Sequence, residues 1–263
     1  DFKNGMTDGK YMIQSDGRRY LYGVTGLDND HNIYVFDTSV SYDNWKIFDT
    51  INTDKSFETL IRSDVTNKLY YSLCGSESGE NYRDLYEYDI NTKTSKFILS
   101  YLNFFEQFIA DGYLYSYNFY SSYNVINGYN CAIYKLSDGS CNNVLLNTEK
   151  KFYQAPMKYN GNYYAVVDCT DGYYLHKINL SDSNIEVGEE ISKIIGSSDI
   201  PIFHSMAFEL AEKYMHIFLF GESDEYEYGF IKQIVYDMEI NSIVRQEAYI
   251  ISEIKNYGAM PSY

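Results

Sequence analysis

The sequence predicts an all-β fold, and three observations lead to this prediction. Aromatic residues make up 18% of the 263 residues, and Tyr alone accounts for 31 of them. Flat rings and branched side chains pack well across neighbouring strands, so this composition favours pleated sheets. Only three Pro occur. A short pattern also recurs along the chain, in which a turn pair precedes an aromatic-rich strand that ends on a small or polar residue.

The recurring pattern has a nearly fixed period. Its five copies are Asp16-Gly17 before RYLYGVTG, Thr66-Asn67 before KLYYSLCG, Asp111-Gly112 before YLYSYNF, Asn160-Gly161 before NYYAVVDC and, less cleanly, Ala211-Glu212 before KYMHIFLFG. Aligned on Tyr20, Leu69, Tyr113, Tyr163 and Tyr214, the copies are 49, 44, 50 and 51 residues apart. Asp-Gly and Asn-Gly favour two-residue hairpins because both central positions take positive φ. The chain therefore reuses one tight β-hairpin.

Each copy is accompanied by two further strands and preceded by another. The second repeat, for example, reads TLIRS, KLYYS, DLYEYD and KFILSY, with polar turns between its strands. Four antiparallel strands at this period are typical of a propeller blade. An all-β sandwich with evenly spaced strands is the alternative, but position-by-position similarity across five repeats disfavours it.

The sequence thus predicts a β-propeller of five four-stranded antiparallel blades, formed as one domain by residues 1–263. The blades are expected at about 10–50, 56–101, 105–148, 154–192 and 202–250. AMPSY at 259–263 is similar to APMKY at 155–159. Residues 255–263 are therefore expected either to close the five-bladed ring or to begin a partial sixth blade.

The strand KLYYS at 68–72 and the following LYEYDINT at 85–92 carry a resemblance to known proteins. They resemble the repeat of tyrosine-rich bacterial surface β-propeller proteins of uncharacterised function, which are similar in pattern to the YWTD-type propellers of lipoprotein receptors. The Trp and Asp of the receptor motif are absent, since Tyr71 and Ser72 hold the matching positions. The resemblance implies the fold and an extracytoplasmic location, either secreted or attached to the cell surface. It implies no functional residue.

The charge of the chain excludes some classes of partner, and the spacing of its cysteines predicts the state of its thiols. With 21 basic and 37 acidic side chains, the net charge is −16. Such a field repels phosphate backbones and anionic headgroups, so neither nucleic acid nor membrane insertion is expected. The four cysteines form no CxxC pair. We expect free, mostly buried thiols, with Cys141 facing Leu136 rather than Cys131.

Sequence signatures of common catalytic and cofactor sites are missing. The sequence has no GxSxG elbow, HExxH pair, Walker loop or dinucleotide glycine fingerprint. His176 and His216 occupy strand positions where other repeats have Tyr, which indicates packing. The segment LDNDHN at 27–32 is rich in oxygen ligands but lacks the spacing of a helix-flanked calcium loop, which favours a solvated turn. No metal and no cofactor are expected.

The uneven loops opposite the tight hairpins are the predicted binding surface. Function on rigid β scaffolds usually lies in such loops, and Tyr offers both an apolar face and a hydroxyl. They are GSESGENYR (75–83), FYSSYNVINGYN (119–130) and GESDEYEYG (221–229), and the predicted ligand-binding residues are Tyr82, Arg83, Tyr120, Tyr123, Tyr129, Asp224, Tyr226 and Tyr228. The favoured function is a non-catalytic module that recognises a glycan or a protein partner.

The alternative function is a propeller-type glycoside hydrolase. That reaction needs two carboxyl groups flanking the scissile bond. Glu58 and Glu106 are the candidates on first strands, with His204 as a possible neighbour. The first strands of the first and fourth repeats carry no carboxylate, so the expected ring of acids near the axis is thin.

Overall fold

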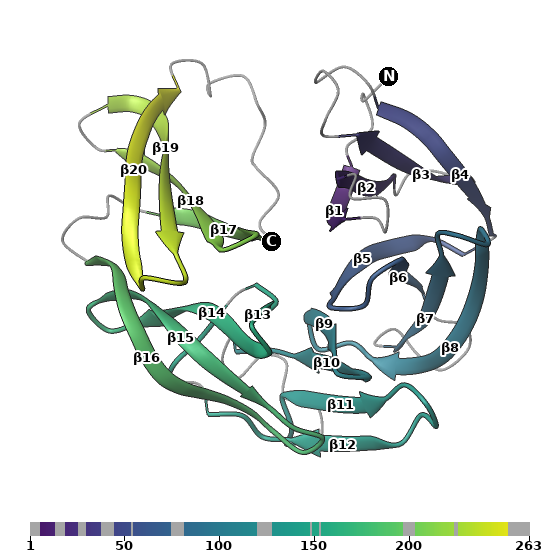
Figure 1. Ribbon diagram of the computed structural model, residues 1–263. Coiled ribbons are helices and arrows are strands. Elements are labelled where there is room, and N and C mark those ends of the chain that lie inside the picture. The colour runs from purple at the N-terminus through teal and green to yellow at the C-terminus, as the bar shows by residue number, and fades with distance from the viewer. Residues whose placement is uncertain are drawn as a thin grey trace. The chain divides into compact units, whose positions relative to one another are not determined.

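The computed structural model describes most of the chain, and every regular element in the part it describes is a β-strand (Figure 1). The described residues are 6–13, 19–25, 30–37, 45–53, 55–74, 82–119, 128–147, 149–152, 154–196, 203–223 and 226–251. The strands follow in chain order within antiparallel groups of four, as the repeat predicts.

The twenty strands of the described residues fall near the expected repeats. The first group is β1 (Met6–Ile13), β2 (Arg19–Thr25), β3 (Asp30–Asp37) and β4 (Trp45–Asn52). The second is β5 (Phe57–Ser63), β6 (Lys68–Cys74), β7 (Tyr82–Asp89) and β8 (Thr94–Leu102), and the third is β9 (Glu106–Ala110), β10 (Tyr113–Tyr117), β11 (Cys131–Lys135) and β12 (Cys141–Val144). The fourth is β13 (Met157–Tyr159), β14 (Asn162–Cys169), β15 (Gly172–Leu180) and β16 (Ile185–Gly196), and the fifth is β17 (Phe203–Ala211), β18 (Tyr214–Ser223), β19 (Tyr226–Asp237) and β20 (Ser242–Ile251). The expected closing segment 255–263 lies outside the described residues.

One strand pairing was not expected from the repeat. The first strands of the second and third groups, β5 and β9, pair in parallel through Arg62 with Phe108 and Ser63 with Ile109. The amide of Asp64 extends the contact by donating to the Ile109 carbonyl at 3.3 Å. These two groups therefore form one eight-stranded sheet.

The chain divides into two compact units. Residues 1–118 and 122–145 form the first unit, which contains β1–β12. Residues 119–121 and 146–263 form the second unit, which contains β13–β20.

Two hydrophobic cores lie within the first unit, one on each face of β5–β8. One core brings Ile33 and Ile51 against Phe57, Tyr71 and other residues of β5–β8. The other core joins β5–β8 to β9–β12 and includes Tyr70, Leu85, Tyr101, Ile109 and Leu114. Each side chain of this size contributes about 1.5–3 kcal/mol when fully buried. The aromatic-rich strands of the repeat thus supply both faces of the second group.

The second unit is also held together by buried strand residues. Ala165, Val166 and Leu175 are fully buried in β14 and β15, and Met215 and Ile217 are fully buried in β18. The Phe208 amide of β17 donates to Gln154 Oε1 at 2.6 Å, which ties β17–β20 to the segment before β13.

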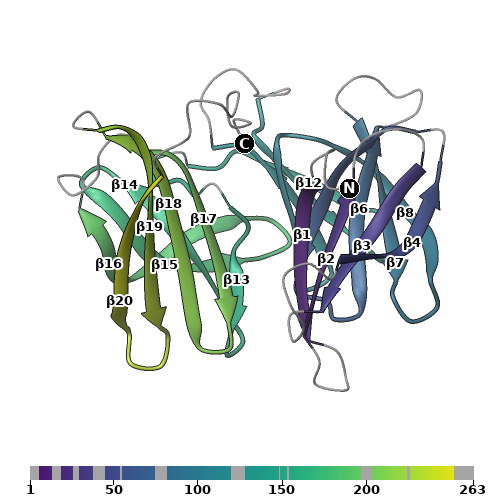
Figure 2. The same cartoon turned by 90° about the horizontal axis from the view of Figure 1, so that it is seen from above.

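Two of the four predicted turn pairs that the structure describes have the predicted backbone conformation. Asp111 and Gly112 have φ values of 47° and 83°, and Asn160 and Gly161 have values of 46° and 78°. Both central positions are therefore in the left-handed region that two-residue hairpins of this kind require. In the other two, Thr66-Asn67 and Ala211-Glu212, only the second residue has positive φ, 59° and 58°. Figure 2 shows the strands of each group running back and forth between such turns and the opposite ends.

Three local predictions were wrong. The cysteines were expected to be mostly buried, but only Cys131 is buried, while Cys74 and Cys169 are partly exposed and Cys141 is exposed. Cys141 pairs with Tyr134 rather than Leu136, because Leu136 and the residues up to Ser140 form a longer turn closed by the Lys135 amide on the Ser140 carbonyl at 2.9 Å. The expected loop at 221–229 is mostly strand, since β18 continues to Ser223 and pairs there with Tyr226 of β19. The alternating residues YEYGF extend the strand pattern to this point.

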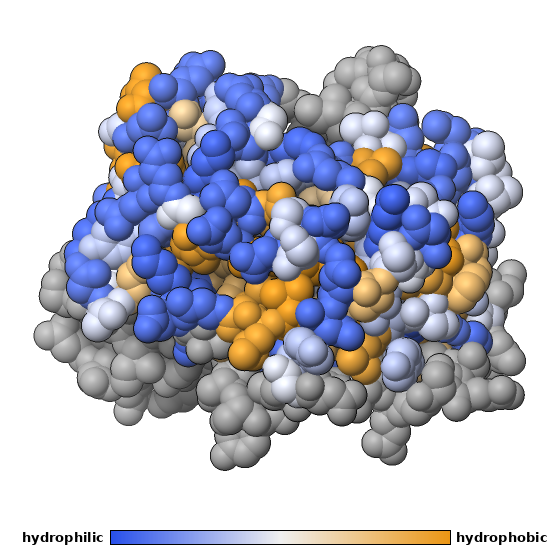
Figure 3. Space-filling model, turned by 90° about the horizontal axis from the view of Figure 1, so that it is seen from below, coloured by the Kyte–Doolittle hydropathy of each residue, from blue (hydrophilic) through white to orange (hydrophobic). Residues whose placement is uncertain are grey.

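The described residues on one face of the protein are mainly polar. Figure 3 shows a face on which hydrophilic residues predominate and hydrophobic residues gather in a few groups. Large hydrophobic side chains exposed among the described residues are Ile47, Tyr82, Phe97, Phe105, Tyr129, Leu145, Ile240 and Val244. No helix in the described part of the chain is long and apolar enough to cross a membrane.

Candidate functional site

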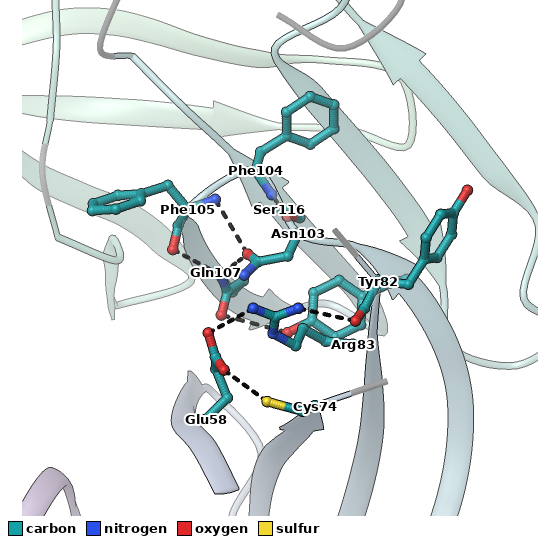
Figure 4. A network of polar contacts seen from close by, with 10 residues as sticks. Glu58, Cys74, Tyr82, Arg83, Asn103, Phe104, Phe105, Gln107 and Ser116 are labelled. Carbon is teal, nitrogen blue, oxygen red and sulfur yellow. Dashed lines mark hydrogen bonds and ion pairs between the residues drawn. The ribbon is translucent and has the colours of Figure 1, made fainter. Parts of the chain in front are cut away.

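A network of polar side chains lies at one end of β5–β10, in the first unit (Figure 4). In antiparallel groups, the starts of the first and third strands lie beside the ends of the second and fourth strands. This end is opposite the tight hairpin turns, as the sequence predicts for the binding surface. We call it the loop-end cluster, and its members are Glu58, Cys74, Tyr82, Arg83, Tyr101, Asn103, Phe105 and Gln107.

An ion pair forms one half of the loop-end cluster. Arg83 Nη2 of β7 donates to Glu58 Oε1 of β5 at 3.0 Å, and Arg83 Nη1 donates to the Tyr82 carbonyl at 3.0 Å. The Cys74 thiol of β6 donates to the second oxygen, Glu58 Oε2, at 3.3 Å. The Arg83 side chain is 17% exposed and that of Glu58 32%. Both oxygens of Glu58 therefore have donors within the protein.

The environment fixes the charges of this half. Burial opposes the charge on Arg83, but its hydrogen bond to Glu58 and the attraction between them outweigh burial and raise the pKa of Arg83. Burial, together with the hydrogen bond to Glu58, raises the pKa of the Cys74 thiol. Cys74 is therefore a neutral donor rather than a thiolate nucleophile.

Tyr101 connects the ion pair to the second half of the cluster. This side chain of β8 is fully buried, and burial raises its pKa well above the ordinary value. The neutral hydroxyl donates to Gln107 Oε1 at 3.5 Å. The charge of Arg83 lowers the pKa of Tyr101, and the charge of Glu58 raises it.

The second half is a clamp around the backbone of Phe105. The Phe105 amide donates to Asn103 Oδ1 at 3.2 Å, and the Phe105 carbonyl accepts from Gln107 Nε2 at 2.7 Å. Gln107 Nε2 also donates to Asn103 Oδ1. Phe104 faces the opposite way, being 2% exposed, and its amide donates to Ser116 Oγ at 2.9 Å. The connection between β8 and β9 is thus fixed on both sides of Phe105.

Three aromatic side chains are exposed at this end of the first unit. Phe105 is 51% exposed, Tyr129 41% and Tyr82 36%. Tyr129 lies near the base of the connection between β10 and β11, which is closed by the Asn118 amide on the Asn130 carbonyl at 2.8 Å. Asn130 Nδ2 returns a hydrogen bond to the Asn118 carbonyl at 3.1 Å. The scaffold beneath these exposed rings is therefore well bonded.

The structure describes only some of the predicted binding residues. Tyr82 and Arg83 are adjacent at the start of β7, and Tyr129 is in the same unit. Tyr120, Tyr123 and Asp224 lie outside the described residues. Tyr226 and Tyr228 lie on β19 of the second unit, but their side chains are not among those described.

The residues predicted for the alternative function, a glycoside hydrolase, lie in both units. Glu58 lies on β5 and Glu106 begins β9, the two first strands that pair in parallel. His204 lies on β17 of the second unit, and its side chain is not among those described. Arg83 and Cys74 bind the oxygens of Glu58, an arrangement that suits a structural ion pair better than a proton donor.

A histidine and a cysteine approach each other in the second unit. His176 of β15 is fully buried, with Nδ1 3.1 Å from the Gly188 carbonyl and Nε2 4.0 Å from Cys169 Sγ. Burial lowers the pKa of His176 and raises that of Cys169. Both groups are neutral, which fits the packing role predicted for His176. Among the residues described, no three His, Cys, Asp or Glu side chains gather as metal ligands.

Sequence reasoning missed Asn103, Phe105 and Gln107. They lie in NFFEQ, between the fourth strand of one repeat and the first strand of the next. The available signal was a pair of Phe residues at a connection, flanked by two carboxamides. This signal is weak because the connection is short and has none of the Tyr residues that mark the longer loops between second and third strands.

Comparisons with known proteins identify the fold. No family model matches the sequence, and no curated protein matches it. The chain is similar to TolB from Acinetobacter baumannii, at 10% identity over 95% of this chain and 55% of that one, with a TM-score of 0.50. It is similar to the polysaccharide lyase Uly1, at 10% identity over 89% of this chain and 58% of that one, with a TM-score of 0.51. It is also similar to the β-propeller domain of the Trilobed protease from Pyrococcus furiosus, at 10% identity over 90% of this chain and 70% of that one, with a TM-score of 0.41.

These matches are distant and show the fold alone. The chain is an all-β protein of four-stranded antiparallel sheets that matches β-propeller structures such as TolB. It spans 55% to 64% of the length of TolB, Uly1 and two oligogalacturonate lyases that it also matches. Because propellers support many activities, the fold leaves function to be argued from the site.

Proposed function

We propose that this chain is a non-catalytic binding module that recognises a glycan through the loop-end cluster. The observation that carries the proposal is the exposure of three aromatic side chains at this end of the first unit. Tyr82 and Phe105 belong to the polar network of Figure 4, and Tyr129 lies in the connection between β10 and β11. Aromatic rings on a fixed scaffold bind with little loss of conformational entropy. In the same proposal, the four-stranded groups are five blades of a propeller, with residues 255–263 beginning a partial sixth blade or closing the ring.

Binding fits the chemistry of the cluster better than catalysis does. A glycoside hydrolase needs one carboxyl group to donate a proton and a second to act as base or nucleophile. Glu58 is bonded to Arg83 and Cys74, so its oxygens are occupied before any substrate arrives. The Cys74 thiol is neutral and takes part in the same contact. These groups hold the sheet ends together and leave the exposed rings as the contact surface.

The charge of the chain supports a neutral or basic partner. A net charge of −16 disfavours nucleic acid and anionic lipid surfaces. A glycan that lacks acidic groups meets no such barrier. The proposed location is extracytoplasmic, where a glycan-binding module would meet cell-surface or environmental polysaccharides.

The test is a glycan array probed with the full chain, followed by a reducing-sugar assay on every glycan that binds. We expect binding without release of new reducing ends. The variant Tyr82→Ala with Tyr129→Ala should weaken capture, and Tyr159→Ala at a tight hairpin turn is the matched control. Release of product would support the hydrolase instead. No binding on the array would contradict the glycan proposal and direct the search to a protein partner.

A further inference from the structure

Phe105 has a backbone conformation that L-residues rarely adopt. Its φ is 138°, in a region where Cβ clashes with the backbone and which is normally left to Gly. The side chain is also large, apolar and 51% exposed. A strained backbone and an exposed hydrophobic ring are both unfavourable for folding alone. Their coincidence at one residue indicates selection for something other than stability.

The surrounding hydrogen bonds hold this conformation in place. Asn103 accepts from the Phe105 amide, and Gln107 donates to the Phe105 carbonyl. The two carboxamides are bonded to each other, and Tyr101 donates to Gln107. Phe104, next to Phe105, is anchored in the core between β5–β8 and β9–β12. The ring of Phe105 is therefore presented on a preorganised turn, which points to recognition of a ligand.

The chemistry of the neighbouring groups selects the class of ligand. The Phe105 ring offers an apolar surface without a hydroxyl, and Asn103 and Gln107 supply amide groups beside it. The nearest ion pair, Arg83 with Glu58, is internally compensated. Together with the net charge of −16, this disfavours an anionic ligand. A pyranose ring has a face of C–H groups that complements an exposed apolar ring, and the carboxamides of Asn103 and Gln107 hold that ring in place.

We propose that Phe105, held by Asn103 and Gln107, is a subsite that stacks against the apolar face of an uncharged sugar ring. The inference rests on the proposed function, because it names the sugar class and the residue that contacts it. Phe105 contacts the ligand, and Asn103 and Gln107 are positioning residues.

The experiment measures affinity and thermal stability together. The full chain is titrated with neutral tetrasaccharides of β-linked glucose, mannose, xylose and N-acetylglucosamine, and with a galacturonate tetrasaccharide as the acidic probe. We expect at least one neutral probe to bind and the acidic probe to bind more weakly. Phe105→Gly should reduce affinity about tenfold or more, a loss of about 1.4 kcal/mol. Phe105→Trp should retain binding because it keeps a flat ring.

Thermal stability shows whether each of these variants is correctly folded. Phe105→Gly should leave the thermal midpoint unchanged or raise it, because Gly relieves the strain. Phe97→Ala is the matched control, since Phe97 of β8 is 49% exposed in the same unit, and it should not change affinity. For Gln107→Ala we expect weaker binding, partly restored in Gln107→Asn.

The outcomes separate the two proposals. Unchanged affinity in Phe105→Gly, with a neutral sugar still bound by the parent chain, would overturn the subsite and leave glycan recognition standing. Preference for the acidic probe would overturn the ligand class. Failure of the parent chain to bind any sugar would overturn the subsite and the proposed function together. A lower midpoint in Phe105→Gly would show that the ring serves folding.

Discussion

At the scale of single residues, the loop-end cluster combines a strained residue with a compensated ion pair. The positive φ of Phe105 costs about 1–3 kcal/mol, which is a sizeable fraction of the stability of a typical domain. The hydrogen bonds that the Phe105 backbone makes with Asn103 and Gln107 offset part of that cost. The ion pair of Arg83 with Glu58 links the start of β7 to the start of β5 across the end of β6, which lies between them.

Glu58→Gln tests whether this ion pair is structural. The change removes the charge partner of a guanidinium that is only 17% exposed, so we expect a loss of about 1–2 kcal/mol in the free energy of unfolding. Urea denaturation measures it. Glu247→Gln is the matched control because Glu247 pairs with Arg245 on the surface of β20, where a pair contributes less than about 1 kcal/mol. Equal losses in the two variants would contradict a structural role for Glu58.

At the scale of elements, β15 and β16 approach each other closely at two glycines, and the approach is closest at Gly172. Gly172 begins β15 with φ of 145°, and a Cβ atom there would lie 2.2 Å from the Ile195 carbonyl oxygen. Gly172→Ala should therefore cost about 2–4 kcal/mol of unfolding free energy by forcing the two strands apart.

Gly161→Ala provides the comparison in the same sheet. Gly161 also has positive φ, 78°, but nothing lies within 4 Å of its added Cβ. This substitution should cost only about 1 kcal/mol, the usual penalty for a left-handed backbone. Chemical denaturation of both variants measures the difference, and similar midpoints would show that the contact at Gly172 is not tight.

A Lys–Asp pair stabilises the turn between third and fourth strands in two groups. Lys68 Nζ lies 2.7 Å from Asp89 Oδ2, and Asp89 Oδ1 accepts from the amides of Asn91 and Thr92. Lys213 and Asp237 repeat the arrangement at the turn after β19, with a distance of 3.0 Å. The hydrogen bond from Lys68, followed by that from the Thr92 amide, lowers the pKa of Asp89 to about 2.

This lowered pKa predicts an acid-sensitive turn. The unfolded chain binds a proton at Asp89 near pH ~3.9, above the folded value. The stabilisation is therefore present above about pH 4 and is lost as the pH falls towards about 2. The urea midpoint should decrease when the pH is lowered from about 6 to about 2.5, and this decrease should be smaller in Asp89→Asn. Glu149→Gln, an exposed control, should not change it; an undiminished fall in Asp89→Asn would contradict the assignment.

Features that depend on neighbouring residues could be predicted from the sequence, and features that depend on residues far apart in the sequence could not. Hairpins at Asp111-Gly112 and Asn160-Gly161 were predictable because their φ requirements are local. The parallel pairing of β5 with β9 was not, because it joins residues 46 positions apart through two residue pairs that carry no sequence signature. The conformation of Phe105 could not be predicted for a similar reason. Its φ depends on Asn103 and Gln107 acting together, and no pattern of residue types identifies a strained backbone conformation.

At the scale of the whole molecule, repeated four-stranded groups supply rigid supports for short connections. Tyr, Phe and Leu from the repeat fill both faces of β5–β8, so the ends of these strands are fixed by cores below them. Fixed strand ends allow a connection such as 103–105 to hold a strained conformation. The net charge of −16 adds a field over the whole surface, which favours neutral or basic ligands over acidic ones.

Amide hydrogen exchange with and without a bound neutral tetrasaccharide tests the central claim most directly. If the loop-end cluster is the binding surface, protection should increase at 82–83 and 103–107, because a bound ligand covers these amides. Exchange at the hairpin turns 111–112 and 160–161 should stay the same. Protection confined to those hairpin turns, or absent from 103–107, would contradict the account.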